Sequence, residues 1–312
     1  MNDYAKFRQK VHGCVVPLPI VYREDLSIDH AGLERYVGWV VENGVRNLCL
    51  TFTFSQLDSV TPEEIIEVTR TVVGAAGQEA VFIPCTGGGP LTGAIDSVRQ
   101  MQKIGAPAAF VHLPEWCLQS VDTGDLYVNY IHGVASQTDM PILCVALPKS
   151  WTPTVPMLTI DRLEKLAEDE NFCGLKDDIY QPDYRMSIAR TFGQRLCTIG
   201  GGNRLHYVLF HHLPNQSEFA GLFDPKRALG FFELLDQNRV PDALDTLEQG
   251  KDAYLSLPGL HWMALNQVVF YAMGFAETYL IRPPLASATD AEAKAIIDNV
   301  RKYPEAYEQI VK

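Results

Sequence analysis

The chain has 312 residues, of which 47% are hydrophobic and 21% are charged, and its formal net charge is -12 with a pI of about 5.1. This composition supports a large folded core, and it excludes long disorder and a nucleic-acid partner held by a basic face. No stretch reaches the ~18 uninterrupted apolar residues of a membrane helix, and the polar start lacks the apolar centre of a signal peptide, so we expect no membrane partner.

Short apolar runs alternate with amphipathic stretches along most of the chain. Eight of these runs are predicted to be buried strands, at 14–18, 48–53, 80–85, 108–113, 141–148, 172–176, 196–199 and 218–223. Asp29 is expected to cap a helix that ends at Asn43-Gly44. Thr61 and Glu64 form a capping box that opens the next helix. After Arg227 only helical patterns follow, including one over 262–279.

The order of these elements predicts the fold. Apolar runs without polar alternation are typical of parallel strands that helices cover on both sides. Eight such units within the first 235 residues favour a (β/α)8 TIM barrel over a doubly wound open sheet. We therefore predict an α/β barrel over 1–235 and a C-terminal helical region over 236–312.

Seven cysteines are scattered through the chain. Six of them lie in apolar, strand-like runs, and no CxxC pair occurs. Zinc-ribbon spacing is therefore absent, and the pattern is typical of reduced core cysteines. We expect a cytoplasmic protein.

In such a barrel the active site lies at the carboxyl ends of the strands. The sixth predicted strand ends in Lys176, and the seventh opens into Gly200-Gly201-Gly202. A lysine there is either a nucleophile that forms a Schiff base, or a strand-end lysine that reaches water or pairs with Asp177 or Asp178. The glycines either form a tight turn or let the backbone N–H groups come close to a carboxylate or phosphate.

Several other chemistries lack their motifs. The chain contains no GxxxxGK[ST] loop, no HExxH helix and no GxSxG elbow. The adjacent His211 and His212 fall in a helix-like segment away from the expected mouth, so we predict no metal site there. We expect no cofactor.

The order and spacing of several short motifs are similar to those of a known family. These motifs are 59–64 (SVTPEE), 85–87 with 94–95 (CTG and AI), 174–177 (GLKD), 200–203 (GGGN) and 282–285 (RPPL). In this respect the chain resembles the dihydrodipicolinate synthase / N-acetylneuraminate lyase family of Schiff-base lyases and aldolases. The resemblance implies that Lys176 forms the imine with a 2-oxo acid, and that the protein is a homo-oligomer, a tetramer or a dimer.

The chain also departs from the family pattern near the expected site. The second-strand signature GTTGE becomes FTFSQ at 52–56, and the fifth-strand YNxP becomes VALP at 145–148. Val145 replaces the tyrosine that shuttles protons in the family, and a valine cannot move a proton. The tyrosine pair after strand four corresponds to Glu115-Trp116. Four residues could supply another acid or base: Glu115, His112, Tyr180 and Asp177.

Three functional hypotheses follow. The first is a lyase, an aldolase or a sugar-acid dehydratase, in which Thr53 and the backbone of 200–202 hold the carboxylate of a 2-oxo acid. Phe54, Ser55, Gly200, Gly201 and Trp116 would contact this substrate, and Glu115 would act in catalysis. The aromatic residues favour a substrate that is less polar than an open-chain sugar acid.

The second hypothesis is a catalytically degenerate barrel that binds a metabolite without turnover, as the altered residues at 52–56 and Val145 suggest. The third is a metal-dependent barrel enzyme that uses Glu115, Asp177 and Asp178, although Lys176 would be a poor neighbour for a cation.

Overall fold

Eight parallel strands form the centre of the molecule. The computed structural model describes residues 3–112, 114, 124–146, 158–179, 181–248, 259–304 and 307. The strands are β1 (Gly13–Pro17), β2 (Asn47–Cys49), β3 (Val81–Ile83), β4 (Ala109–Phe110), β5 (Ile142–Ala146), β6 (Phe172–Asp177), β7 (Cys197–Gly200) and β8 (Gln216–Phe219). They are hydrogen-bonded in the order β3-β2-β1-β8-β7-β6-β5-β4.

The two ends of this sheet also meet. Cys85 forms a parallel bridge with Phe110, and the Thr86 N–H donates to the Phe110 carbonyl at 2.9 Å. Sequential strand order together with this junction makes a nearly closed (β/α)8 barrel, which confirms the predicted fold and excludes the doubly wound sheet. The eighth strand begins two residues earlier than the apolar run at 218–223 indicated, because polar Gln216 and Ser217 belong to it.

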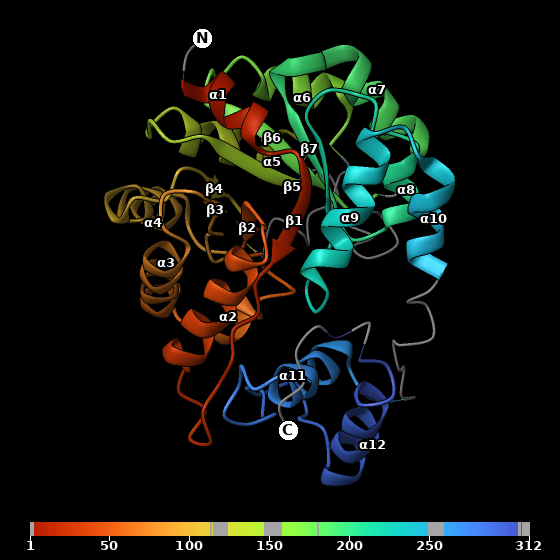
Figure 1. The fold of residues 1–312 in the computed structure, drawn as a ribbon. Helices are drawn as coiled ribbons and strands as arrows, with labels where there is room; N and C mark the ends of the chain where they lie inside the picture. The colour runs from red at the N-terminus through yellow and green to blue at the C-terminus, as the bar shows by residue number, and fades with distance from the viewer. Residues whose placement is uncertain are drawn as a thin grey trace.

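Helices surround the barrel (Figure 1). They are α1 (Asp3–Lys10), α2 (His30–Glu42), α3 (Pro62–Ala76), α4 (Leu91–Ile104), α5 (Gly124–Ala135), α6 (Ile160–Leu166), α7 (Pro182–Phe192), α8 (Arg204–Val208) and α9 (Pro225–Asp236). The predicted caps are present: the Asp29 side chain accepts from the Gly32 N–H, and Thr61 and Glu64 form a complete capping box.

The C-terminal region contains α10 (Val240–Glu248), α11 (Trp262–Ala272) and α12 (Asp290–Val300). The helix predicted over 262–279 ends at Ala272, because Gly274 takes a positive φ of 81° that breaks the helical path. In Figure 1, α11 and α12 lie at the end of the molecule opposite α1. The division of the chain at residue 235 remains a prediction.

Aromatic and charged contacts attach this region to the barrel. Tyr36 of α2 meets the rings of Phe270 and Phe275 edge-on, at centroid distances of 5.1 and 5.2 Å. Arg282 makes two hydrogen bonds of 2.7 Å with the Glu64 carboxylate, one from each terminal nitrogen. This ion pair holds the pKa of Glu64 below its ordinary value. The RPPL segment thus binds the C-terminal region to the start of α3.

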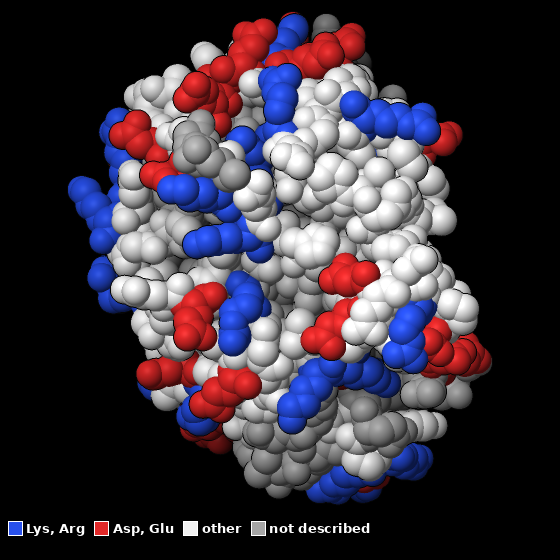
Figure 2. Space-filling model, turned by 45° about the horizontal axis from the view of Figure 1, so that its top comes forward, with Lys and Arg blue, Asp and Glu red and all other residues white. Residues whose placement is uncertain are grey.

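The molecular surface carries charges of both signs. Figure 2 shows acidic side chains among the basic ones on the face drawn there, so this face offers no purely basic stripe for phosphates. In the described part of the chain, no helix is long and apolar enough to cross a membrane.

Candidate active site

Lys176 lies near the carboxyl end of β6, where the barrel opens. Its backbone is in register with Val145 of β5 and with Ile199 of β7. The side chain is 12% exposed and projects into a cavity of about 140 Å³ at this end of the barrel. A larger hollow of about 850 Å³ lies near the opposite ends of the strands, beside Tyr4, Val81 and Pro141. The smaller cavity is the candidate site, because it occupies the end of the barrel where catalytic groups gather in this fold.

The Lys176 ammonium is paired with Asp178. Its Nζ contacts Asp178 Oδ2, and the Asp178 side chain is only 2% exposed. Nζ also lies 5.2 Å from the centroid of the Phe219 ring, which places the cation near an aromatic face. Both contacts offset the cost of removing the lysine charge from water. The pairing with Asp178 is one of the arrangements that the sequence left open.

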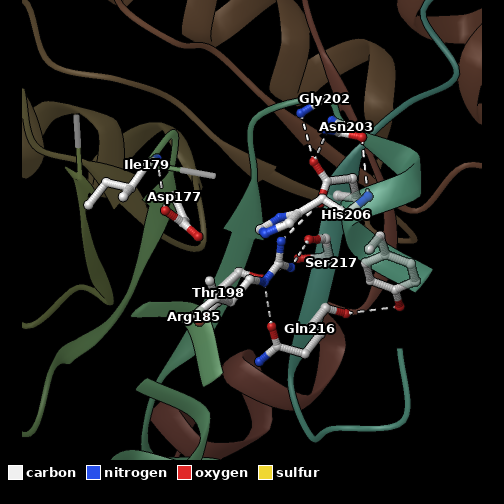
Figure 3. A network of polar contacts seen from close by, with 11 residues as sticks. Asp177, Ile179, Arg185, Thr198, Gly202, Asn203, His206, Gln216 and Ser217 are labelled. Atoms are coloured by element: carbon white, nitrogen blue, oxygen red, sulfur yellow. Dashed lines mark hydrogen bonds and ion pairs between the residues drawn. The ribbon is translucent and has the colours of Figure 1, made fainter. Parts of the chain in front are cut away.

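Asp177 belongs to a different environment from Asp178. Its Oδ1 accepts from the Ile179 N–H at 2.9 Å (Figure 3), and its side chain is buried and does not line the cavity. Burial raises the pKa of Asp177, and the charge of Arg185 on α7 partly opposes this rise. An acid or base that acts on the imine would need to face Lys176 across the cavity. Asp177 does not.

The positions of the two aspartates also argue against a metal site in the cavity. Asp178 is engaged by Lys176, while Asp177 lies outside the cavity. Within the described ranges, no group of three or more His, Cys, Asp or Glu side chains is arranged to hold a metal ion. Glu115 lies outside the described residues.

The loop after β2 forms one wall of the cavity. Thr51, Thr53 and Phe54 line it, and the predicted roles of Thr53 and Phe54 remain predictions. Ser55, in contrast, is fully buried: its hydroxyl donates to the Leu18 carbonyl at 2.7 Å and accepts from the Thr51 N–H at 3.1 Å. The prediction that Ser55 contacts substrate does not fit this geometry, because both bonds are used to fix the loop.

The glycine loop after β7 has an internal partner. The N–H groups of Gly202 and Asn203 donate to Glu218 Oε1 at 2.7 and 2.9 Å, and the Gly201 N–H donates to the Asp177 carbonyl at 3.2 Å. Gly201 lines the cavity, whereas Gly200 does not. The amides of 201 and 202 that we expected to hold a substrate carboxylate are thus already engaged. The Glu218 carboxylate takes the Gly202 amide, and the Asp177 backbone carbonyl takes the Gly201 amide.

Glu218 is itself held by a buried network, of which Figure 3 labels Arg185, Gln216 and Ser217. Arg185 Nη1 donates to Glu218 Oε2 at 3.0 Å, and both side chains are fully buried. The same guanidinium donates to Gln216 Oε1 and to the Ser217 carbonyl, each at 2.9 Å. Burial raises the pKa of Glu218, and Arg185 opposes that rise. The only sign of this network in the sequence is a glutamate inside a strand-like run.

Aromatic rings form much of the remaining wall. Phe52 stacks on His112 at a centroid distance of 3.8 Å, and Phe54 stacks on Trp262 at 5.5 Å. Trp262 is the first residue of α11, so the C-terminal region contributes to the cavity. Trp262 was not predicted to belong to the site, because nothing in its local sequence pattern places a helix start at the mouth of a barrel.

Val145 faces the cavity, as the motif comparison predicted. Tyr127 of α5 donates its hydroxyl to the Val145 carbonyl, and burial raises the pKa of Tyr127 well above its ordinary value. This tyrosine is buried and does not line the cavity. Glu115, Trp116 and Tyr180 lie outside the described residues, so their predicted roles have no structural account.

Comparison with known proteins gives the family. The model of the dihydrodipicolinate synthetase family matches residues 10–210. The chain belongs to this family of lyases. It is 21% identical over 287 residues to a 4-hydroxy-tetrahydrodipicolinate synthase from Staphylococcus haemolyticus, which covers 87% of this chain and 90% of that protein. Several other curated relatives match over only about three fifths of their own length.

Several solved structures share the fold of this chain. CdNal from Clostridium difficile, in complex with mannosamine, superposes with a TM-score of 0.82 at 17% identity, covering 94% of this chain and 99% of that one. YagE, a prophage protein of the dihydrodipicolinic acid synthase family from E. coli K12, in complex with pyruvate, gives 0.79 at 16%, covering 93% and 98%. At these identities the likeness shows the fold.

Proposed function

We propose that this family member is a lyase that acts on a 2-oxo acid through a Schiff base at Lys176. The observation that carries the proposal is the position of Lys176: an almost buried amine, near the carboxyl end of β6, inside the cavity at the mouth of the barrel. An amine removed from water and next to a carboxylate can pass its proton to that carboxylate and attack a carbonyl. The binding of pyruvate by YagE, a protein of the same fold, supports the substrate class.

The imine would supply the driving force for bond cleavage. A protonated imine withdraws electrons from the neighbouring carbon, so it makes a C–H bond acidic or a C–C bond breakable. Aldol cleavage and dehydration both begin from this intermediate. The hydroxyls of Thr51 and Thr53 line the same cavity as Lys176 and are our candidates for binding the substrate carboxylate.

The aromatic walls of the cavity favour a substrate of low polarity. Phe52, Phe54, Phe219 and Trp262 supply large apolar surfaces around Lys176, and Asp178 is the only carboxylate among the described residues of the lining. A polyhydroxylated chain would need more hydrogen-bond partners than these walls provide. We infer a 2-oxo acid whose substituent is apolar or carries a ring.

A second candidate function has specific support. Val145 offers no proton, and the amides of the glycine loop are engaged by Glu218 and Asp177. Both features favour a barrel that binds a 2-oxo acid without turning it over.

A turnover assay separates the two functions. The protein is incubated with a panel of 4-hydroxy-2-oxo acids, some with aliphatic and some with aromatic substituents, and with sugar acids, and release of pyruvate or formation of a new 2-oxo product is measured. We expect turnover of at least one apolar member, lost in Lys176→Met. The matched control is Lys294→Met, because Lys294 is exposed, pairs with Asp298 and does not line the cavity. Binding of a 2-oxo acid without product would establish the second function instead.

We also propose a cellular location and an oligomeric state. All six cysteines among the described residues are free and buried, which supports a protein that works in the reducing cytoplasm. The family resemblance supports a homo-oligomer, a tetramer or a dimer.

A further inference from the structure

We propose that Asp178 is the acid and base that forms and hydrolyses the imine on Lys176; this inference rests on the proposed function. Asp178 Oδ2 touches the amine that would react, and the side chain is nearly inaccessible to solvent. Its other oxygen, Oδ1, is buried without a hydrogen-bond partner in the structure. Asp178 lines the cavity, holds one oxygen on the nucleophile and leaves its second, buried oxygen without a hydrogen-bond partner.

The other described groups near Lys176 are less suited to this role. Val145, its neighbour on β5, has no proton to give, and the Tyr127 hydroxyl is directed to a backbone carbonyl. Asp177 is turned away from the cavity and accepts a backbone hydrogen bond. His112 lines the cavity, but its ring is stacked face to face on Phe52. Asp178 alone among the described groups is in contact with Nζ and able to both give and take a proton.

The pair can complete imine formation without any other reactant. Asp178 takes a proton from the ammonium, and the amine lone pair attacks C2 of the 2-oxo acid. The carbonyl π electrons move to oxygen, which takes the proton back from Asp178. The nitrogen then returns one proton to Asp178, and Asp178 passes it to the hydroxyl, which leaves as water while the nitrogen lone pair closes the C=N bond. Ammonium and ketone have become protonated imine and water.

The charges at the end of this sequence match those at its start. Asp178 is again a carboxylate, and it again lies beside a single positive charge on the nitrogen of Lys176. A buried cation without a counter-ion is costly, so the same aspartate stabilises the protonated imine that the later bond cleavage requires. Hydrolysis of the product imine is the same sequence in reverse.

The rate at which pyruvate is trapped on Lys176 by borohydride tests this inference. We expect Asp178→Asn to slow adduct formation about 10²- to 10⁴-fold, the usual contribution of a positioned acid or base. Asp178→Ala should be equally slow and should be accelerated by added formate, a carboxylic acid small enough to enter the space left. Asp177→Asn is the matched control and should react at the wild-type rate.

The outcomes distinguish this inference from the proposed function. If the wild-type protein forms no adduct with any 2-oxo acid, the proposed function fails and this inference falls with it. If the wild-type protein forms the adduct and folded Asp178→Asn forms it equally fast, only the role of Asp178 is overturned. A measurement on the wild-type protein tests the inference even if the variants do not fold. The rate at which wild type is trapped should not change with buffer concentration at constant pH. A rate that rises in proportion to buffer concentration would contradict an internal acid.

Discussion

At the scale of single residues, the site depends on how one buried lysine charge is compensated. An isolated ammonium at 12% exposure would be expensive, and the structure supplies a carboxylate at Asp178 and an aromatic face at Phe219. The two neighbouring aspartates differ in how their buried charges are compensated. Asp178 is ion-paired, whereas Asp177 is buried with one backbone donor and a raised pKa.

The raised pKa of Asp177 predicts a dependence of stability on pH. Below about pH 4 both the folded and the unfolded chain hold this proton, so Asp177 contributes nothing. As the pH rises, the unfolded chain loses the proton first, so the folded state loses stability relative to it. This loss grows until the pH exceeds the folded-state pKa of Asp177, and above that pH it stays constant. Asp177→Asn mimics the neutral acid and keeps an oxygen for the Ile179 N–H. We therefore expect its free energy of unfolding to increase relative to wild type between pH 4 and pH 7.

Urea unfolding at several pH values checks this prediction. Asp25→Asn is the control of opposite sign, because hydrogen bonds from Ser27 lower the pKa of Asp25 in the folded state. That variant should lose stability relative to wild type as the pH rises through the same region. A difference between wild type and Asp177→Asn that does not change with pH would show that burial does not disfavour the Asp177 charge.

At the scale of elements, β7, β8 and α7 together fix the glycine loop. Gly200 has no side chain because a Cβ there would lie 1.9 Å from Glu218 Oε2. Glu218 cannot move aside easily, since Arg185 of α7 binds one of its oxygens and two loop amides bind the other. The glycine is therefore required by packing against an internal carboxylate.

Gly200→Ala should consequently destabilise the fold, by about 3 kcal/mol, as expected for overpacking at a rigid site. Gly74→Ala is the matched control: Gly74 lies in α3 with open space around the position of a Cβ, and alanine there should add about 0.5–1 kcal/mol of stability. Thermal unfolding of the two variants measures both effects. A Gly200→Ala protein as stable as wild type would mean that Glu218 is free to shift.

The sequence predicted most of the barrel and only part of the site. Apolar runs and capping residues determine strands and helix starts locally, so the eight strands and the caps at Asp29 and Thr61 were predictable. The direction of a side chain in a loop depends on tertiary neighbours. Ser55 turns inward to the Leu18 carbonyl, and the glycine-loop amides turn to Glu218, and neither choice is encoded in the local pattern. Trp262 reaches the site only through the path of the C-terminal region.

At the scale of the whole molecule, the C-terminal region contributes to the barrel mouth. Arg282 anchors this region to Glu64, and aromatic packing on Tyr36 fixes α11 and the residues that follow it against α2. These contacts bring Trp262 onto Phe54 beside the cavity. The cavity end of the barrel is thus completed by residues that lie beyond the family match at 10–210.

Trp262→Ala should therefore weaken the binding of substrates with apolar substituents. Loss of one aromatic stacking contact, about 0.5–1.5 kcal/mol, corresponds to a rise in KM of about 2- to 12-fold. Because Trp262 is 43% exposed, we expect little change in thermal stability. Leu205→Ala, at an exposed position on α8, is the control and should leave KM unchanged. An unaltered KM in Trp262→Ala would show that the C-terminal region does not contact the substrate.

The most direct test of the central claim is to locate the covalent adduct. The protein is incubated with pyruvate or another 2-oxo acid, reduced with borohydride, digested and analysed by mass spectrometry. We predict one modified peptide, which contains Lys176 and carries the mass of the reduced imine, and no adduct in Lys176→Met. A modification on other lysines with Lys176 unmodified, or none with any 2-oxo acid, would contradict a Schiff base at Lys176.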